Sequence, residues 1–150
     1  MRRKKPIFQL MVKDPDITIV GGSLTGAVTA LAAAQAGFRV LVLDQLAPQT
    51  QAEQGFDGRS YAMALTSVRL LKALGLWADL VETAQPILKI KVADGSPSTG
   101  PSPFFMQFDH AEIEEGPMGH MVEDRFLRPL LQQAMARYES IDYIGGTALI

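Results

Sequence analysis

A six-residue segment near the start of the chain has the composition of a phosphate-binding turn. It consists of Gly21, Gly22, Ser23, Leu24, Thr25 and Gly26. A β-rich apolar run at residues 17–20 precedes it, and an alanine-rich helical run follows at residues 25–36. At the N-terminus of such a helix the backbone N–H groups point outward and carry partial positive charge, which suits a pyrophosphate. The glycine spacing therefore predicts a dinucleotide-binding turn.

The small residues of this turn have different expected roles. Gly21 permits the sharp turn out of the strand, and Gly26 lets the helix press against the strands. The pattern G-x-G-x-x-G has a glycine at its middle position, whereas this chain has Ser23 there. Serine is small, and its hydroxyl could donate to a phosphate oxygen, but it could equally weaken binding. The effect of Ser23 is left open by the sequence.

An acidic residue ends the next apolar run. Asp44 follows the run at residues 38–43 and lies 23 positions after Gly21. In dinucleotide-binding βαβ units a carboxylate at this place accepts hydrogen bonds from a ribose 2′-hydroxyl, and it disfavours a 2′-phosphate because two negative charges would meet. The strand–turn–helix–strand–acid order favours nucleotide binding over the alternative, in which the glycines simply form turns.

The elements that position these residues belong to a globular chain of ordinary composition. The 150 residues are 47% hydrophobic and 20% charged, with a net charge of −2, which indicates neither disorder nor attraction to nucleic acid. The chain has no cysteine, which excludes a disulfide scaffold and a thiolate nucleophile and fits a reducing, cytoplasmic compartment. A metal site is not expected, because His110 and His120 have no cysteine to complete a ligand set.

Residues 1–15 are interpreted as a flexible basic N-terminal extension. Four basic residues precede an apolar patch at residues 7–12 that contains Gln9. A secretory signal needs about 7–15 apolar residues and a membrane span about 20. Weak attraction to a membrane surface is the alternative role of this segment.

Beyond residue 44 the apolar periodicity predicts a mixed series of elements. Helices are expected at residues 66–74, 76–81 and 124–138. Strands are expected at residues 87–93, 104–108, 121–123 and 141–144. The polar stretch 48–58 is expected to be a loop, and Pro129 should make the last helix start late or kink. The fold class is therefore α/β, a Rossmann-like βαβ domain with an inserted β-hairpin or small sheet, incomplete at the C-terminus where a further apolar run begins.

Four motifs together resemble the N-terminal part of the ubiquinone-biosynthesis hydroxylases. They are IVGGSLTGAVTALAAAQAGFRVLVLD, DGRSYAMAL, SVRLLKALGLW and GHMVEDRFLRPLL, in this order and at these spacings. These hydroxylases are FAD-dependent aromatic monooxygenases, more distantly related to p-hydroxybenzoate hydroxylase. The resemblance covers nearly all of residues 16–150, and it implies that they form the N-terminal part of an FAD-binding domain, without the substrate domain and a later FAD motif.

The resemblance also implies which residues would contact FAD. They are Gly21, Gly22, Ser23, Leu24, Thr25 and Gly26 at the pyrophosphate, Asp44 at the adenosine ribose, Arg59 along the pyrophosphate and ribityl chain, and Arg125 as a second cationic contact. Guanidinium groups match phosphate geometry, which supports both arginines. Without the resemblance, each arginine is better explained by an ion pair with a neighbouring acid such as Asp57 or Asp124.

For the complete enzyme, the resemblance implies hydroxylation of a polyprenylated phenol by O2, with NAD(P)H as the reductant. The flavin carries this chemistry, so no catalytic acid, base or nucleophile is assigned. The 150-residue chain alone is expected to be inactive. The resemblance further implies a cytoplasmic protein, peripheral to the inner membrane, with partners in a ubiquinone-biosynthesis complex and no nucleic-acid partner.

Three alternatives remain at this point. One is a non-catalytic FAD- or ADP-binding module that acts with a partner chain. Another is an NAD-dependent dehydrogenase domain, although the strand pair within residues 87–108 interrupts the alternation of a simple doubly wound domain. The third is a non-functional remnant whose open sheet edges would promote aggregation.

Overall fold

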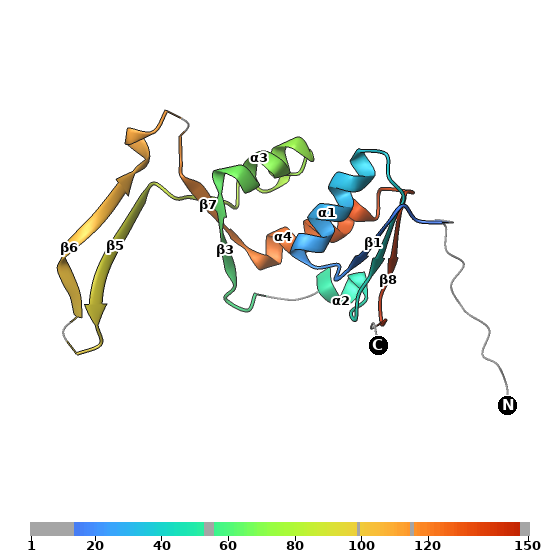
Figure 1. The fold of residues 1–150 in the computed structure, drawn as a ribbon, viewed down its shortest axis with the longest axis horizontal. Coiled ribbons are helices and arrows are strands. Elements are labelled where there is room, and N and C mark those ends of the chain that lie inside the picture. The colour runs from blue at the N-terminus through green and yellow to red at the C-terminus, as the bar shows by residue number, and fades with distance from the viewer. Residues whose placement is uncertain (1–13, 53–55, 99, 115, 148–150) are drawn as a thin grey trace. The chain divides into compact units, whose positions relative to one another are not determined.

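The computed structural model describes most of the chain, namely residues 14–52, 56–98, 100–114 and 116–147. The expected N-terminal extension lies outside the described residues except for its last two positions, and the apolar run at residues 148–150 lies outside them as well. The chain divides into two compact units, which are Met1–Asp57 with Arg125–Ile150, and Gly58–Asp124. Figure 1 follows the elements along the chain.

The first unit is built on a parallel sheet. Its strands are β1 (Ile17–Val20), β2 (Val40–Leu43) and β8 (Ile141–Ile144), in the order β1-β2-β8. Helix α1 (Leu24–Gln35) connects β1 to β2 and packs on both strands (Figure 1). The register pairs Val20 with Leu43 and Leu43 with Ile144, so the carboxyl ends of the three strands meet at one edge. Ligands bind at this edge in open parallel sheets.

Small and β-branched residues explain how α1 packs on this sheet. The buried residues of α1 are Ala27, Ala30, Leu31 and Ala34. Because most of them are alanines, the helix can approach the strands closely. On the sheet side, Val40 and Val42 of β2 are fully buried, as β-branched residues often are in strands covered by a helix.

Two helices of the first unit differ from the sequence-based expectation. Residues 48–58 were expected to form a loop, but α2 (Pro48–Ala52) is helical, and a proline is tolerated at a first helical position because its N–H would lack a helical partner there. Helix α4 (Asp124–Met135) runs through Pro129, so the expectation of a late start is wrong. Burial of its stripe Leu127, Leu131 and Met135 outweighs the hydrogen bond that the proline cannot donate.

The second unit contains a small antiparallel sheet and a helix. The sheet has the order β3-β7-β4 and consists of β3 (Ser60–Ala64), β4 (Gln85–Pro86) and β7 (Gly119–Glu123). Helix α3 (Leu65–Ala73) follows β3, and single 3-10 turns form η1 (Trp77–Asp79) and η2 (His110–Glu112). The buried apolar residues of this unit are Val68, Leu71, Leu76, Trp77, Leu80 and Val122.

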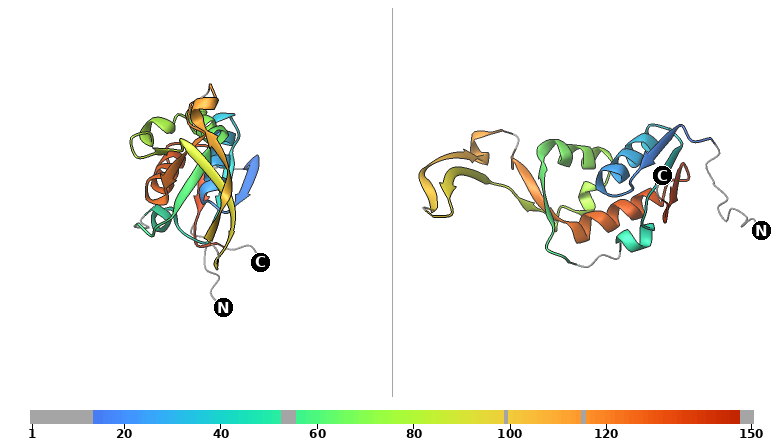
Figure 2. Two further views of the ribbon diagram at one scale, coloured as in Figure 1. Left: turned by 90° about the vertical axis from the view of Figure 1, so that its left-hand side faces the viewer. Right: turned by 60° about the horizontal axis from the view of Figure 1, so that its bottom comes forward.

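The second unit also carries a long β-hairpin. Strands β5 (Lys89–Ser96) and β6 (Gly100–Asp109) form a sheet of their own, as the right-hand view of Figure 2 shows. The strands are longer than expected from the sequence, so the irregular connection is correspondingly shorter.

Ile90 pairs with Phe108 and Val92 with Met106, which places these four side chains on one face of the hairpin. They are between 40% and 61% exposed. The expected α/β fold with an inserted hairpin is confirmed, and the hairpin presents an apolar face to solvent.

Candidate functional site

The turn between β1 and α1 depends on glycines at both of its ends. Gly21 has a φ of +94°, a conformation that residues with a side chain rarely adopt. A Cβ atom at Gly26 would overlap the carbonyl oxygen of Gly21. Any side chain at position 26 would therefore push α1 away from the turn. Both glycines have the geometric roles that their spacing predicted.

Gly22 is held by groups from three other elements. Its N–H donates to Asp44 Oδ2 at 2.6 Å, and its carbonyl accepts from Gln132 Nε2 of α4 at 2.9 Å. A Cβ atom at this position would overlap the ring of Tyr143 on β8. The backbone of the turn is thus fixed from the end of β2, from α4 and from β8.

The carboxylate of Asp44 organises the loop after β2 as well as the turn. While Oδ2 accepts from Gly22, Oδ1 accepts from the N–H of Leu46 at 2.7 Å. A carboxylate accepts about four hydrogen bonds, so these two bonds leave acceptor positions for a ligand hydroxyl. A hollow of about 330 Å³ adjoins this group, lined by Val20, Gly21, Leu43, Asp44, Gln45, Leu46 and Thr147.

Ser23 precedes α1 but does not cap it. Its backbone is extended, as at an N-cap, yet its side chain makes no cap hydrogen bond, and the first turn of α1 contains no acidic residue. Instead, Arg128 Nη1 donates to Ser23 Oγ at 2.8 Å. The same nitrogen lies 3.4 Å from Gln51 Oε1. The serine hydroxyl, considered above as a phosphate donor, therefore serves as an acceptor for a buried arginine.

Gln51 and Tyr143 extend this polar network. Gln51 Nε2 donates to the Tyr143 hydroxyl at 2.8 Å, and that hydroxyl donates to the Leu46 carbonyl at 3.3 Å. Burial, and then the nearby charge of Asp44, raise the pKa of Tyr143 to about 12, although the hydrogen bond from Gln51 opposes the shift. The phenol therefore keeps its proton, and remains a donor, at neutral pH.

The polar residues of this network were not predicted from the sequence. They are the buried Gln51, Arg128 and Gln132 and the half-buried Tyr143. One signal was available: Arg128 and Gln132 are four positions apart beside the apolar stripe of α4, so they fall on the same side of the helix. Polar residues at that spacing next to a buried stripe indicate side chains directed at a neighbouring backbone.

Of the two arginines predicted as cofactor contacts, Arg59 forms an ion pair and Arg125 contacts aromatic rings. Arg59, in the second unit, has Nη2 at 3.7 Å from Oδ2 of the buried Asp124. This ion pair is the alternative that the local sequence favoured. Arg125, in the first unit, has its guanidinium carbon 4.9 Å from the ring centre of Phe56 and 4.8 Å from that of Phe126.

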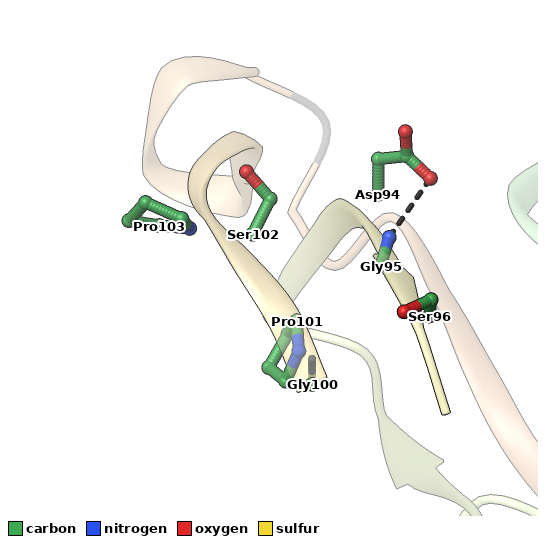
Figure 3. A pocket seen from close by; sticks show the side chains of 7 residues that line it. All are labelled: Asp94, Gly95, Ser96, Gly100, Pro101, Ser102 and Pro103. Atoms are coloured by element: carbon green, nitrogen blue, oxygen red, sulfur yellow. Dashed lines mark hydrogen bonds between the residues drawn. The ribbon is translucent and has the colours of Figure 1, made fainter. Parts of the chain in front are cut away.

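Another hollow lies at the end of the hairpin. It measures about 380 Å³ and is lined by the residues labelled in Figure 3, Asp94, Gly95, Ser96, Gly100, Pro101, Ser102 and Pro103. Asp94 is the ionisable residue in this lining, and its Oδ1 accepts from the N–H of Gly95 at 2.8 Å. This hollow does not adjoin a helix N-terminus, whereas the turn after β1 leads directly into α1, so the turn after β1 is the candidate site for a phosphate.

Comparison with protein families gives this site a context. Residues 14–142 match the family described as the FAD binding domain. The chain belongs to this FAD-binding family. The glycine turn, the uncapped start of α1 and Asp44 are consistent with that assignment, because they offer N–H donors and an acceptor where a dinucleotide binds an open parallel sheet. FAD, predicted as the cofactor from the sequence, is confirmed.

Two curated relatives are hydroxylases by name, one of ubiquinone and one of 3-demethoxyubiquinol. This FAD-binding chain is 43% identical over 132 residues to ubiquinone hydroxylase UbiL of Rhodospirillum rubrum, covering 88% of the chain and 29% of the relative. It is 33% identical over 129 residues to 3-demethoxyubiquinol 3-hydroxylase of Escherichia coli, covering 84% of the chain and 31% of the relative. The predicted resemblance is confirmed, and the chain spans less than a third of the length of these relatives.

Solved structures share the fold of the FAD-binding chain. AlpK superposes with a TM-score of 0.64 at 22% identity, covering 89% of the chain and 24% of AlpK. The p-nitrophenol 4-monooxygenase PnpA of Pseudomonas putida gives a TM-score of 0.63 at 17% identity, covering 87% of the chain and 31% of PnpA. At these identities the comparisons establish the fold.

Proposed function

We propose that this chain is the FAD-binding portion of an NAD(P)H-dependent flavin monooxygenase that hydroxylates a polyprenylated phenol in ubiquinone biosynthesis. The observation that carries the proposal is a glycine turn held at the carboxyl edge of a parallel sheet, in a chain 43% identical to a ubiquinone hydroxylase. Because the chain spans 29% of that relative, the activity belongs to the longer protein, and the 150-residue chain alone is inactive.

In this proposal the turn holds the diphosphate of FAD through its backbone. The N–H groups of Leu24 and Thr25 lie in the uncapped first turn of α1, where helix polarity favours an anion. The spare acceptor positions of Asp44 receive hydrogen bonds from the adenosine ribose. Bound FAD supplies the redox and oxygen chemistry, while Gly21 to Gly26 and Asp44 bind and orient it.

Arg59 and Arg125 are proposed as cationic contacts to the same cofactor. The side chain of Arg59 is 47% exposed despite its ion pair, so a ligand can reach it. The guanidinium of Arg125 lies over the rings of Phe56 and Phe126. A guanidinium can contact aromatic rings and still donate from its N–H groups to a phosphate, because it has five donors in a planar fork.

Titration with FAD and with NAD, followed by flavin or protein fluorescence, tests the cofactor assignment. The 150-residue chain should bind FAD saturably and more tightly than NAD. Tighter binding of NAD would instead favour a dehydrogenase domain. Activity requires a second measurement on the longer protein, in which NAD(P)H oxidation should depend on O2 and on a polyprenylated phenol. Phenol-dependent turnover by the 150-residue chain would contradict its proposed inactivity.

The location of the longer protein follows from the substrate class. We propose a cytoplasmic protein that associates peripherally with the inner membrane, where a polyprenylated phenol partitions, and that meets partners of a ubiquinone-biosynthesis complex there. Among the residues described, no helix is both long and apolar enough to cross a membrane. Co-sedimentation of the longer protein with vesicles containing a polyprenylated phenol should exceed that with vesicles lacking it, and equal sedimentation would contradict the proposal.

A further inference from the structure

Ser23, the departure from the glycine pattern, is paired with an arginine that is distant in the sequence. Arg128 of α4 lies 105 positions further along the chain, and its Nη1 donates to Ser23 Oγ at 2.8 Å. The Arg128 side chain is buried, with a relative exposure of 7% for the residue. Burial of a guanidinium costs free energy unless the group is hydrogen-bonded, and the bond to Ser23 is one of the contacts that hold Arg128 in place.

The Ser23 hydroxyl is hydrogen-bonded to Arg128 and not to the start of α1. A serine at an N-cap ordinarily accepts a hydrogen bond from an N–H of the first helical turn. Here the Ser23 side chain makes no cap bond to α1, and its Oγ accepts from Arg128 instead. The N–H groups of the first turn therefore remain available to an anion, and the residue just before them is hydrogen-bonded to a buried guanidinium.

A second side chain of α4 acts on the neighbouring residue of the turn. Gln132, one helical turn after Arg128, is also buried and donates from Nε2 to the Gly22 carbonyl at 2.9 Å. Together, Arg128 and Gln132 hold two successive residues of the turn. The position of the turn is thus set by the helix as well as by the strands.

We propose that Arg128 is a positioning residue of the FAD site that acts through Ser23. It fixes the turn, keeps the serine from capping α1, and adds positive charge behind the N–H groups that receive the diphosphate. On this basis Ser23 is compatible with cofactor binding because its hydroxyl accepts a hydrogen bond from Arg128 and does not cap α1. The inference rests on the proposed FAD binding and deepens it.

The test compares ligands with and without phosphates on variants of the 150-residue chain. Arg128→Gln removes the charge and is too short to reach Ser23 Oγ, and Arg137→Gln is the matched control because Arg137 is exposed and lies just beyond the end of α4. Arg128→Gln should weaken FAD and ADP binding by about tenfold, as for a lost hydrogen bond to a charged group, and leave adenosine binding nearly unchanged. Arg137→Gln should affect none of the three ligands.

The coupling between the two residues supplies a second readout. In a Ser23→Ala background, Arg128→Gln should weaken ADP binding less than it does in the unsubstituted chain, because the bond through which Arg128 acts is already lost. Additive losses would contradict action through Ser23. Equal losses for ADP and adenosine, or no loss for either, would overturn the inference.

Folding and cofactor binding are controlled separately. Thermal melts without ligand establish that each variant is folded. If Arg128→Gln does not fold, Arg128→Met decides, since it removes the charge and the donors but keeps much of the apolar stem of the side chain. A loss of affinity confined to phosphate ligands supports the inference, and unchanged ADP affinity overturns it. Failure of the unsubstituted chain to bind FAD would overturn the proposed function, whereas a failure confined to the Arg128 variants would leave that function standing.

Discussion

Replacement of Gly26 tests the close approach of α1 to the turn. In Gly26→Ala the new Cβ would overlap the Gly21 carbonyl oxygen, so the helix or the turn must shift. We expect at least a tenfold loss of FAD affinity and a loss of about 1–3 kcal/mol in the free energy of unfolding, as for an overpacked site. FAD titration and urea unfolding measure the two effects. Thr29→Ala, at an exposed position of the same helix, is the control and should change stability by no more than about 0.5 kcal/mol.

His120 makes the stability of the second unit depend on pH. Burial, and then the positive charge of Lys72, lower the pKa of His120 below its ordinary value of 6.5. Its Nδ1 is buried without a hydrogen-bond partner among the described residues, and its ring meets Trp77 edge-on at 4.9 Å. The unfolded chain then binds a proton more readily than the folded chain. The stabilisation is complete above pH 6.5 and declines as the pH falls from 6.5 toward the lowered pKa.

Urea unfolding at several pH values between about 5 and 8 measures this dependence, because an unperturbed histidine titrates near 6.5. His120→Phe should flatten the profile in this range, since phenylalanine keeps the contact with Trp77 and does not titrate. His110→Phe is a suitable control because it removes the chain's other histidine. An unchanged slope in His120→Phe would contradict the assignment.

Individual residues of the site were predictable where a local constraint fixes their type. Gly21 and Gly26 stand within one short segment, and the backbone conformation or close approach at each excludes a side chain. Arg128 was not predictable in the same way, because its contact with Ser23 joins residues 105 positions apart. The resemblance pointed to Arg125, whose guanidinium lies over the rings of Phe56 and Phe126 in the structure.

At the level of elements, the strands of the βαβ unit were predicted well because their apolar runs are bounded by turn residues. The errors lie where tertiary packing opposes local preference. Pro129 disfavours a helix interior, yet burial of Leu127 and Leu131 keeps α4 helical. Similarly, α2 forms in a polar stretch because Gln51, 2% exposed, has its partner in β8 rather than nearby in the sequence.

The start of the βαβ unit contains an ion pair between the segments that lead into β1 and β2. Arg39 Nη2 lies 2.9 Å from Asp16 Oδ1, while the N–H and Nε of Arg39 donate to Oδ2 at 2.8 and 3.1 Å. The side-chain hydrogen bond from Arg39, followed by the backbone bond, lowers the pKa of Asp16 from 3.8 to about 2. Because the folded chain holds its proton less tightly than the unfolded chain, the stabilisation is present above pH 3.8 and is lost as the pH falls toward 2.

Asp16→Asn should therefore be less stable than the unsubstituted chain at neutral pH, by a small amount because both side chains are partly exposed. The difference between the two proteins should shrink between pH 4 and pH 2 in acid-unfolding curves. Asp14→Asn, an exposed acid nearby for which such a bond is not described, serves as the control. A difference that persists at pH 2 would contradict the role of the ion pair.

The whole molecule presents an apolar surface whose consequences can be measured directly. One face of the β5–β6 hairpin is apolar and exposed, and it is formed by Ile90, Val92, Met106 and Phe108. The chain itself spans 29% of UbiL and 31% of the 3-demethoxyubiquinol 3-hydroxylase. The alternation along residues 87–93 predicted a half-exposed strand, but it could not reveal that the apolar side is exposed as well. A contiguous apolar face of this kind promotes association between copies of a chain.

We expect Val92→Thr with Met106→Ser to reduce self-association of the 150-residue chain without changing its affinity for FAD. The two residues are paired across the strands, so the double substitution interrupts the middle of the apolar face while threonine keeps the β-branched shape of valine. Sedimentation velocity over a range of concentrations measures association, and FAD titration on the same samples measures the affinity of the glycine turn for FAD.

Gln107→Ser, in the register between Met106 and Phe108 but on the opposite face, is the control and should associate like the unsubstituted chain. If the double variant associates as strongly as this control, some other surface drives association. If it also loses FAD affinity, the hairpin affects cofactor binding, which the contacts of the glycine turn do not predict.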